Sequence, residues 1–312
     1  MRVGVIINPI AGGGGLVRRR AALQAALARH FGDAVLRETG GGGDAAQLAR
    51  AFAASGFGLV IAAGGDGTAS EVADGLLEGL ADGAPMPDLG IVPCGTGADF
   101  ARGLGLGGDI TAVIDRIAGA EPRPIDAGRA CYVDDHGALA CRHFLNIASL
   151  GLSGATDRAI NADRRKGKGS AKALFLWRTV IEFLRYRFQD VRITVDDGEP
   201  TEARVALVAA ANGRFFGGGM MIAPDAEIDD GLLDIVVVRA SGKAGLIWDL
   251  RLLYGGRHRN HHAITIQRGR KVTVEPLGGR LENLALVDID GESPGRIPVT
   301  FEIMPGALRL RY

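Results

Sequence analysis

Cysteine is scarce in this chain, and the few cysteines are not arranged as redox or zinc sites usually are. The 312 residues contain only Cys94, Cys131 and Cys141, and no two of these form a Cys-x-x-Cys pair. An odd and sparse set argues against a disulfide framework. It favours a reducing, cytoplasmic environment.

Net charge and long apolar runs are also missing. The 36 basic residues balance the 36 acidic residues, so no global field draws in nucleic acid, and we expect no nucleic-acid partner. No apolar run approaches the ~18 residues that span a bilayer. The first residues indicate a short strand and a turn rather than a signal peptide. We therefore expect a cytoplasmic protein, with at most peripheral contact at the inner membrane face; a homodimer is compatible with the sequence.

Glycine, by contrast, is abundant, with 48 residues, and the most informative cluster lies at residues 64–68. An apolar run at 59–63 precedes it and predicts a buried strand, and a helix-like segment follows at 69–77. Such a turn lets backbone N–H groups approach a phosphate, and the helix N-terminus adds partial positive charge. Asp66 within the turn would repel phosphate unless a divalent cation, usually Mg²⁺, lies between them. The cluster therefore predicts a nucleotide polyphosphate site and phosphoryl transfer.

The order of strand and helix signals predicts two different halves. The first ~125 residues alternate strands and helices, which favours a doubly wound parallel α/β sheet. Pro122 and Pro124 mark a boundary, because prolines stop a helix and stiffen a linker. Beyond it, apolar residues alternate with period two, as at 191–195, and Asp197-Gly198 is a hairpin signal. The second half is therefore predicted to be mostly antiparallel β.

Three glycine-rich turns follow three predicted strands of the first half, at 8–14, 64–68 and 95–96. The carboxyl ends of parallel strands share one edge of a sheet, so we expect these turns to converge on one nucleotide. They match neither common nucleotide motif. Val17 occupies the last glycine position of a Rossmann fingerprint, and no Gly-Lys pair is followed by Ser or Thr.

The ordered motifs of the chain resemble the diacylglycerol kinase catalytic-domain superfamily, which includes soluble bacterial lipid kinases and eukaryotic diacylglycerol, sphingosine and ceramide kinases. The resemblance covers nearly the whole chain and rests on six motifs: Asn8–Gly13, Gly64–Thr68 with Glu71, Pro93–Ala101, Asn146–Gly151, Gly217–Asp234, and Asp290–Glu292. It implies an ATP-binding domain related to NAD kinase and phosphofructokinase at residues 1–124. A β-sandwich lipid-substrate domain follows at 125–303, with a segment at about 304–312 as a candidate to return to the first domain.

The same resemblance implies roles for individual residues. Nucleotide contacts map onto Asn8, Thr39, Gly64, Gly65, Asp66, Gly67, Thr68, Glu71, Gly95 and Thr96. A structural Mg²⁺ maps onto the Asp230 side chain and the backbone carbonyls of Glu227 and Leu232, with the water-linked Asp66, Asp99 and Asp126 extending toward the nucleotide. The catalytic base maps onto Asp290, with Glu292 beside it.

The residues around this acidic pair support that role independently. In an extended strand, Asp288, Asp290 and Glu292 share one face. A carboxylate suits phosphoryl transfer, because the attacking hydroxyl becomes acidic only as its bond to phosphorus forms. A strand-end turn is the alternative for Asp290–Glu292, and a tight turn is the alternative for Asp230-Gly231.

We therefore predict an ATP- and Mg²⁺-dependent lipid kinase that transfers the γ-phosphate to a lipid hydroxyl, with diacylglycerol giving phosphatidic acid as the first candidate. Two alternatives stay open. An NAD kinase-like enzyme would share the glycine-rich cluster. A regulatory lipid- or nucleotide-binding pseudokinase is suggested by Ala98, which stands where the superfamily usually has asparagine.

Two weaker signals have competing interpretations. Basic and aromatic residues gather between Arg164 and Phe188, as in a helix that lies on an anionic membrane surface or simply a helix with one solvated face. His258, His261 and His262 are close in sequence but lack cysteine or carboxylate partners nearby, so we predict a loop rather than a metal site.

Overall fold

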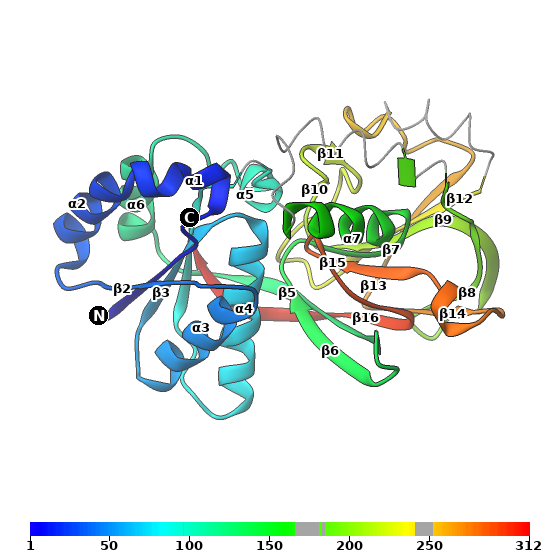
Figure 1. The fold of residues 1–312 in the computed structure, drawn as a ribbon, viewed down its shortest axis with the longest axis horizontal. Helices are drawn as coiled ribbons and strands as arrows, with labels where there is room; N and C mark the ends of the chain where they lie inside the picture. Colours follow the sequence, from blue (N-terminus) through cyan, green and yellow to red (C-terminus); the bar gives the residue numbers. More distant parts are fainter. Residues whose placement is uncertain (96, 166–180, 183–184, 241–251) are drawn as a thin grey trace.

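The computed structural model of the protein describes residues 1–95, 97–165, 181–182, 185–240 and 252–312. It has two lobes side by side, an α/β lobe that contains the N-terminus and a second lobe built mainly of strands (Figure 1). Most of the basic and aromatic stretch at 164–188 falls outside the described residues. No helix among the described residues is long and apolar enough to cross a membrane.

The first lobe is the predicted doubly wound sheet. Its parallel strands lie in the order β4-β3-β1-β2 and comprise β1 (Val3–Ile7), β2 (Val35–Glu38), β3 (Leu59–Gly64) and β4 (Asp88–Pro93). The helices are α1 (Ala11–Arg18), α2 (Arg20–Phe31), α3 (Asp44–Ala54), α4 (Asp66–Ala81), α5 (Asp99–Gly103) and α6 (Ile110–Gly119). One apolar core lies against α3 and α4 and another against α2 and α6. Strands covered on both faces explain the continuous apolar runs of β1 and β3.

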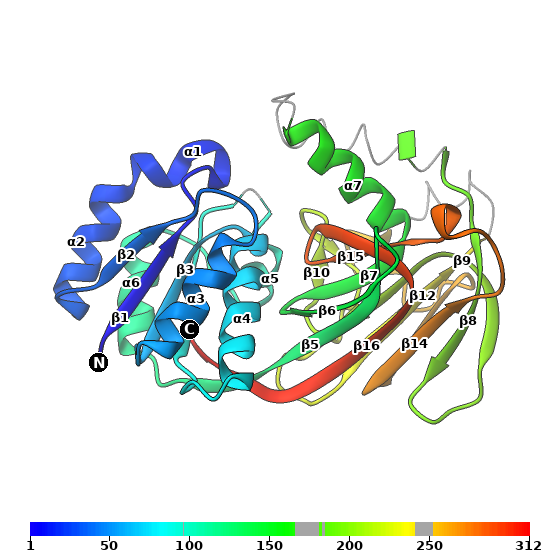
Figure 2. The same ribbon diagram turned by 60° about the horizontal axis from the view of Figure 1, so that its bottom comes forward.

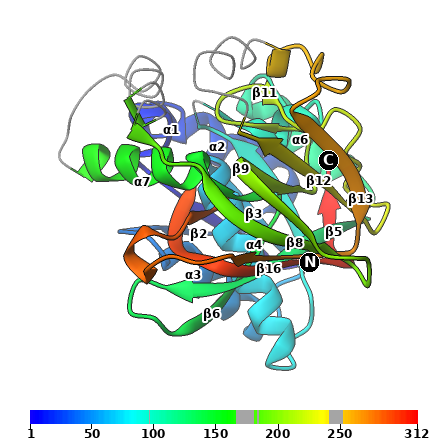
Figure 3. The ribbon, with the colours of Figure 1, turned by 90° about the vertical axis from the view of Figure 1, so that its right-hand side faces the viewer.

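The second lobe is an antiparallel β-sandwich, as predicted (Figure 3). Its elements are β5 (Arg123–Asp134), β6 (Leu139–Phe144), β7 (Ile147–Gly151), α7 (Leu152–Arg165), β8 (Gln189–Val195), β9 (Thr201–Ala211), β10 (Phe215–Phe216), β11 (Met220–Met221), β12 (Leu233–Arg239), β13 (Ile264–Gly269), β14 (Lys271–Pro276), η1 (Leu281–Asn283), β15 (Leu286–Ile289) and β16 (Glu292–Arg311). The α7 helix lies over β15 and the start of β16 (Figure 1).

Strand β16 joins the two lobes. It has 20 residues and pairs with β5, β14 and β15 in the sandwich (Figure 2). Its far end pairs in parallel with β4 of the first lobe, where Leu310 lies opposite Leu89. Leu308 and Leu310 are fully buried in the apolar core of that lobe. The C-terminal residues therefore complete the sheet of the α/β lobe.

One sequence-based expectation about cysteine is wrong. Cys131 and Cys141 form a disulfide between adjacent strands β5 and β6, where they are direct cross-strand partners with Cα atoms 4.1 Å apart. The spacing of the two cysteines does not reveal this, because the hairpin register alone places them opposite each other. Cys94 is free and buried.

The junction between β16 and β4 gives a stability prediction. Leu310→Ala should lower the free energy of unfolding by about 2–5 kcal/mol, because it leaves a cavity in a closed apolar core. Leu139→Ala is the matched control, since Leu139 is 79% exposed and should lose little. Denaturant unfolding followed by circular dichroism measures both. Equal losses for the two variants would show that the β16 end is not part of the first core.

Candidate active site

The three glycine-rich turns meet at the carboxyl ends of β1, β3 and β4. The side-chain amide of Asn8 donates to Thr68 Oγ1 at 3.0 Å, which ties the first turn to the second. Two glycines allow the third turn to approach the first and the second turn closely. A Cβ on Gly12, whose φ is +59°, would lie 2.2 Å from the Cys94 carbonyl, and one on Gly95 would lie 2.7 Å from Gly65 Cα. The predicted convergence of the three turns is therefore present, although Thr96 itself lies outside the described residues.

The remaining nucleotide candidates lie at or near the same edge. Thr39 directly follows β2, and its backbone N–H donates to the Ile7 carbonyl. Glu71 in the second turn of α4 accepts a hydrogen bond from the backbone N–H of Ala45 at 3.2 Å, so it caps the start of α3. Gly64, Gly65 and Gly67 surround the N-terminus of the 16-residue helix α4, where the helix dipole favours an anion.

Asp66 and Asp99 form an acidic pair beside this helix end. The Asp66 carboxylate accepts hydrogen bonds from the backbone N–H groups of Asp99, at 2.9 Å, and Phe100, at 3.2 Å. Asp99 accepts from Arg102 at 2.7 Å and from the backbone N–H of Gly218 at 2.7 Å. Burial is the main cause that raises the pKa of both carboxyls. The pair therefore links α5 of the first lobe to the β10–β11 hairpin of the second.

Ala98 precedes α5 in the left-handed conformation, with φ 49° and ψ 46°. This backbone region costs a residue with a Cβ about 1–2 kcal/mol, and asparagine tolerates it better than most. The superfamily's usual asparagine would therefore suit the backbone at this position. Alanine keeps the conformation but brings backbone strain and no side-chain amide.

Asp290 lies in the tight turn between β15 and β16, with φ 48°. Its carboxylate accepts three backbone hydrogen bonds, from Leu145 at 2.8 Å, Asn146 at 3.1 Å and Ile147 at 2.9 Å. Burial raises its pKa most; the Ser70 hydroxyl and the backbone donors lower it, and the charge of Asp66 raises it. Asp290 therefore reaches from the sandwich lobe toward the first turns of α4, in a fixed orientation.

Glu292 behaves differently from Asp290. It is exposed at the start of β16, and no side-chain hydrogen bond holds it among the described residues. Its negative charge adds to the rise in the pKa of Glu71, which burial causes first. Glu292 of the sandwich lobe is therefore close enough to Glu71 of the α/β lobe for the two charges to repel each other.

The residues implied for a structural cation lie in the loop before β12. Asp230 Oδ1 accepts from the backbone N–H of Leu232 at 3.0 Å, whereas no described residue forms a hydrogen bond with the buried Oδ2. Such an oxygen would suit a cation, but the Arg268 guanidinium already faces it at 3.3 Å. Asp126 accepts from the backbone N–H groups of Gly231 and Gly306. Along the described chain, this loop included, no three acidic, histidine or cysteine side chains cluster as metal ligands.

The expected acidic network is thus seen as two groups. Asp66 lies with Asp99 near α5, and Asp126 lies with the loop that carries Asp230. Glu227 is exposed in that loop.

The histidine stretch at residues 258–262 is a turn region, as predicted. His258, however, is fully buried, with its Nε2 2.8 Å from the Ile222 carbonyl, and burial lowers its pKa.

Asp288 is a site residue to which sequence reasoning gave no role. It is buried, and its Oδ1 accepts the backbone N–H of Gly291 at 2.9 Å while Oδ2 accepts the Ser149 hydroxyl at 3.0 Å. Ser149 in turn contacts Ser153 of α7 at 2.7 Å. The only sequence signal was the strand alternation that placed Asp288 on the same face as Asp290.

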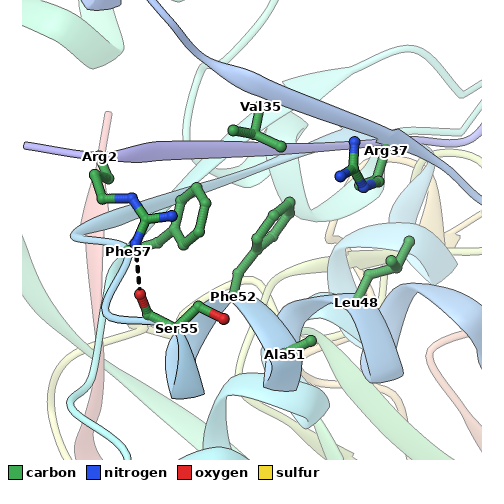
Figure 4. Close-up of a pocket in the computed structure, with 8 residues that line it drawn as sticks. All are labelled: Arg2, Val35, Arg37, Leu48, Ala51, Phe52, Ser55 and Phe57. Carbon is green, nitrogen blue, oxygen red and sulfur yellow. Dashed lines mark hydrogen bonds between the residues drawn. The ribbon is translucent and has the colours of Figure 1, made fainter.

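One hollow of the described structure lies away from these acids. It has a volume of about 350 Å³ and is lined by residues of β2 and α3 and by Arg2, Ser55 and Phe57 near the amino ends of β1 and β3 (Figure 4). Arg2 lies 4.2 Å above the Phe57 ring and donates to the Ser55 carbonyl. Because it opens at the opposite ends of the strands, it is not part of the candidate active site.

The strained backbone at position 98 generates one prediction. Ala98→Asn should raise the free energy of unfolding by about 0.5–1 kcal/mol, because asparagine adopts the left-handed conformation at lower cost. Ala51→Asn in the exposed face of α3 is the control and should be destabilising, because asparagine is a poorer helix former. Chemical denaturation of both variants provides the test. A loss of stability in Ala98→Asn would contradict the strain argument.

The buried Asp288 generates a pH prediction. Burial, followed by the charge of Asp157, raises the pKa of this carboxyl well above its ordinary 3.8. The stabilisation from the protonated Asp288 carboxyl is therefore complete at pH values below the pKa that this group has in the unfolded chain. It is lost as the pH rises through the higher pKa of the group in the folded protein. Asp288→Asn removes the charge. Its amide oxygen can still accept the Gly291 N–H, and its NH2 group can donate to Ser149 Oγ while that hydroxyl donates to Ser153. Its Tm should therefore equal or exceed that of the wild type at neutral pH.

The difference in Tm should vanish near the ordinary carboxyl pKa of about 4. Asp288→Ala separates charge from hydrogen bonding, since it loses both contacts and should have the lower Tm at every pH. Thermal unfolding across a pH series measures all three proteins. A wild type that is clearly more stable than Asp288→Asn at neutral pH would mean that Asp288 is stabilised in its charged form.

Comparison with known proteins agrees with the two-lobed site. Residues 2–130 match the diacylglycerol kinase catalytic domain, and residues 146–312 match the YegS C-terminal NAD kinase beta sandwich-like domain. The chain is 30% identical to "Diacylglycerol kinase" of Mycobacterium tuberculosis, covering 99% of this chain and 94% of that protein. It is 31% identical to "Probable lipid kinase YegS-like" of Pseudomonas aeruginosa, covering 94% and 88%.

A crystal structure of a diacylglycerol kinase from Bacillus anthracis superposes with a TM-score of 0.72 at 26% identity, over 100% of this chain and 96% of that one. Both matched domains thus lie in the same order as in relatives that align along nearly their whole length. The chain belongs to the family of lipid kinases that combine a diacylglycerol kinase catalytic domain with a YegS-type β-sandwich domain.

Proposed function

We propose that the protein is an ATP- and Mg²⁺-dependent kinase that transfers the γ-phosphate of ATP to a lipid hydroxyl. The observation that carries the proposal is the position of Asp290. Its carboxylate is held by three backbone N–H groups of residues 145–147 and reaches toward the N-terminal turns of α4. Asp290 is a fixed acid of one lobe, and it lies opposite a helix end of the other lobe that is suited to phosphate. This arrangement suits the attack of a hydroxyl on a phosphate.

In this proposal Asp290 takes the proton of the lipid hydroxyl. A carboxylate offers about four lone-pair sites, so beside the three backbone donors one site remains for a hydroxyl, either that of Ser70 or that of the substrate. Burial raises its pKa, which makes it a better base than a solvated aspartate. The proton needs to move only as the oxygen–phosphorus bond forms, so a weak base in the correct place is sufficient.

The first lobe would hold the nucleotide. The N-terminus of α4 and the turn at Gly12–Gly14, where all three glycines have positive φ, present backbone amides suited to phosphate oxygens. Mg²⁺, when bound with the nucleotide, would offset phosphate charge. Asp66 and Asp99, already oriented by backbone donors, are the acids placed to position it.

The acceptor class rests on the relatives. Proteins named diacylglycerol kinase and YegS-like lipid kinase support a lipid hydroxyl, with diacylglycerol as the first acceptor to test and phosphatidic acid as its product. We expect the lipid to be met at a membrane surface. The basic and aromatic stretch at 164–188 that suggested surface contact lies mostly outside the described residues, so this part rests on the sequence alone.

The role of Asp290 gives the central prediction. Asp290→Asn should lower phosphoryl transfer by about 10²–10⁴-fold, because the amide cannot accept the hydroxyl proton. Nucleotide binding should persist, since the nucleotide-binding turns belong to the other lobe. Labelled ATP with diacylglycerol measures transfer, and calorimetry measures ATP affinity. Asp197→Asn, in an exposed hairpin turn, is the matched control and should remain active.

Other results would redirect the proposal. Normal turnover by Asp290→Asn would remove the assigned base. If NAD rather than a lipid from a mixed extract became labelled, the enzyme would be a small-molecule kinase. Stoichiometric ATP binding without labelling of any lipid would instead support a regulatory, non-catalytic role.

A further inference from the structure

The loop at residues 225–234, which includes the first two residues of β12, is strongly acidic and contains no lysine or arginine. Residues 225–234 include Asp225, Glu227, Asp229, Asp230 and Asp234, and no lysine or arginine occurs between residues 222 and 238. Two of these acids are poorly solvated, since the side chain of Asp234 is 5% exposed and that of Asp230 is 19% exposed. Buried carboxylates need a compensating charge or hydrogen bonds, so the loop requires a cation from elsewhere.

Arg268 reaches this loop from the neighbouring strand. It lies in β13 directly opposite Asp234 of β12. Its Nη2 donates to the Asp225 carbonyl at 2.7 Å, its Nη1 lies 3.3 Å from Asp230 Oδ2, and its Nε lies 3.6 Å from Asp234 Oδ1. One guanidinium thus contacts the beginning, the middle and the end of the acidic loop.

Other groups brace the loop without reaching the same oxygen. Arg259 pairs with the Asp225 carboxylate, and Arg214 Nε donates to the Ala226 carbonyl at 2.9 Å. Asp126 fixes the backbone N–H of Gly231. Within the described part of the chain, Asp230 Oδ2 has no hydrogen bond, and the cation that lies beside it is the Arg268 guanidinium. This oxygen belongs to the side chain onto which the structural Mg²⁺ of the superfamily maps.

We propose that Arg268 supplies, from within the chain, the positive charge that a structural divalent cation would bring to the loop at residues 225–234. A guanidinium keeps its charge at all working pH values and offers five donors in a plane, so it can bridge two carboxylates and a carbonyl. The loop is then held without bound metal. The Mg²⁺ that accompanies the nucleotide is a separate requirement, so this inference does not depend on the proposed reaction.

Thermal unfolding of the full chain without nucleotide tests this, first in chelator and then in excess Mg²⁺. The variants are Arg268→Gln and the matched control Arg270→Gln, whose exposed side chain has no ion pair in the described structure. The wild type and the control should show no change of Tm with Mg²⁺. Arg268→Gln should lose about 2–5 °C in chelator and regain part of it in Mg²⁺. Adding Asp230→Asn to Arg268→Gln should abolish that recovery.

Two results would overturn the proposal. One is a wild-type Tm that rises with Mg²⁺ as much as that of Arg268→Gln, because the loop would then bind a cation despite the arginine. The other is an Arg268→Gln Tm equal to that of Arg270→Gln in chelator. Equilibrium dialysis of the nucleotide-free wild type with Mn²⁺ tests the same idea even if the variant does not fold. No tight site is expected in the loop, and one Mn²⁺ per chain that binds to the wild type but not to Asp230→Asn would refute the proposal.

Discussion

The three backbone hydrogen bonds to the Asp290 carboxylate are the interaction on which the arrangement of the site depends. These bonds attach the side chain to the segment that joins β6 to β7, although the backbone of Asp290 itself has a positive φ. Asp288 accepts the backbone N–H of Gly291 and is itself held by the Ser149 hydroxyl, and Asn161 of α7 donates to the Gly291 carbonyl at 3.0 Å. A strained turn is thus supported from two sides, as expected where a side chain must be presented in one orientation.

The three acids of the site all have raised pKa values. Burial raises the pKa of Asp66, Asp99 and Asp290, which belong to different lobes yet lie close enough for Asp66 to raise the pKa of both others. Such a cluster has unfavourable self-repulsion that a cation or a proton relieves. This condition agrees with a site that works on a cation-bound polyphosphate, as proposed for the nucleotide.

Much of the fold was readable from the sequence because its signals are local. Apolar runs gave β1 and β3, period-two alternation gave β8, and glycine clusters gave the turns that meet at one sheet edge. The rest depends on pairing between distant segments. The Cys131–Cys141 bond follows from hairpin register, the Asp99–Gly218 contact joins residues of different lobes, and Arg268 reaches its acids through the β12–β13 pairing. No local pattern encodes these contacts.

The path of β16 has a consequence for the modularity of this protein. Its first residue follows the turn that carries Asp290, and its last residues supply Leu308 and Leu310 to the α/β lobe. A fragment ending near residue 122 would leave β4 as an open edge and an apolar core unfilled. The two lobes are therefore not interchangeable cassettes, and a chimera with a relative would have to exchange β5 and β16 together to keep their register.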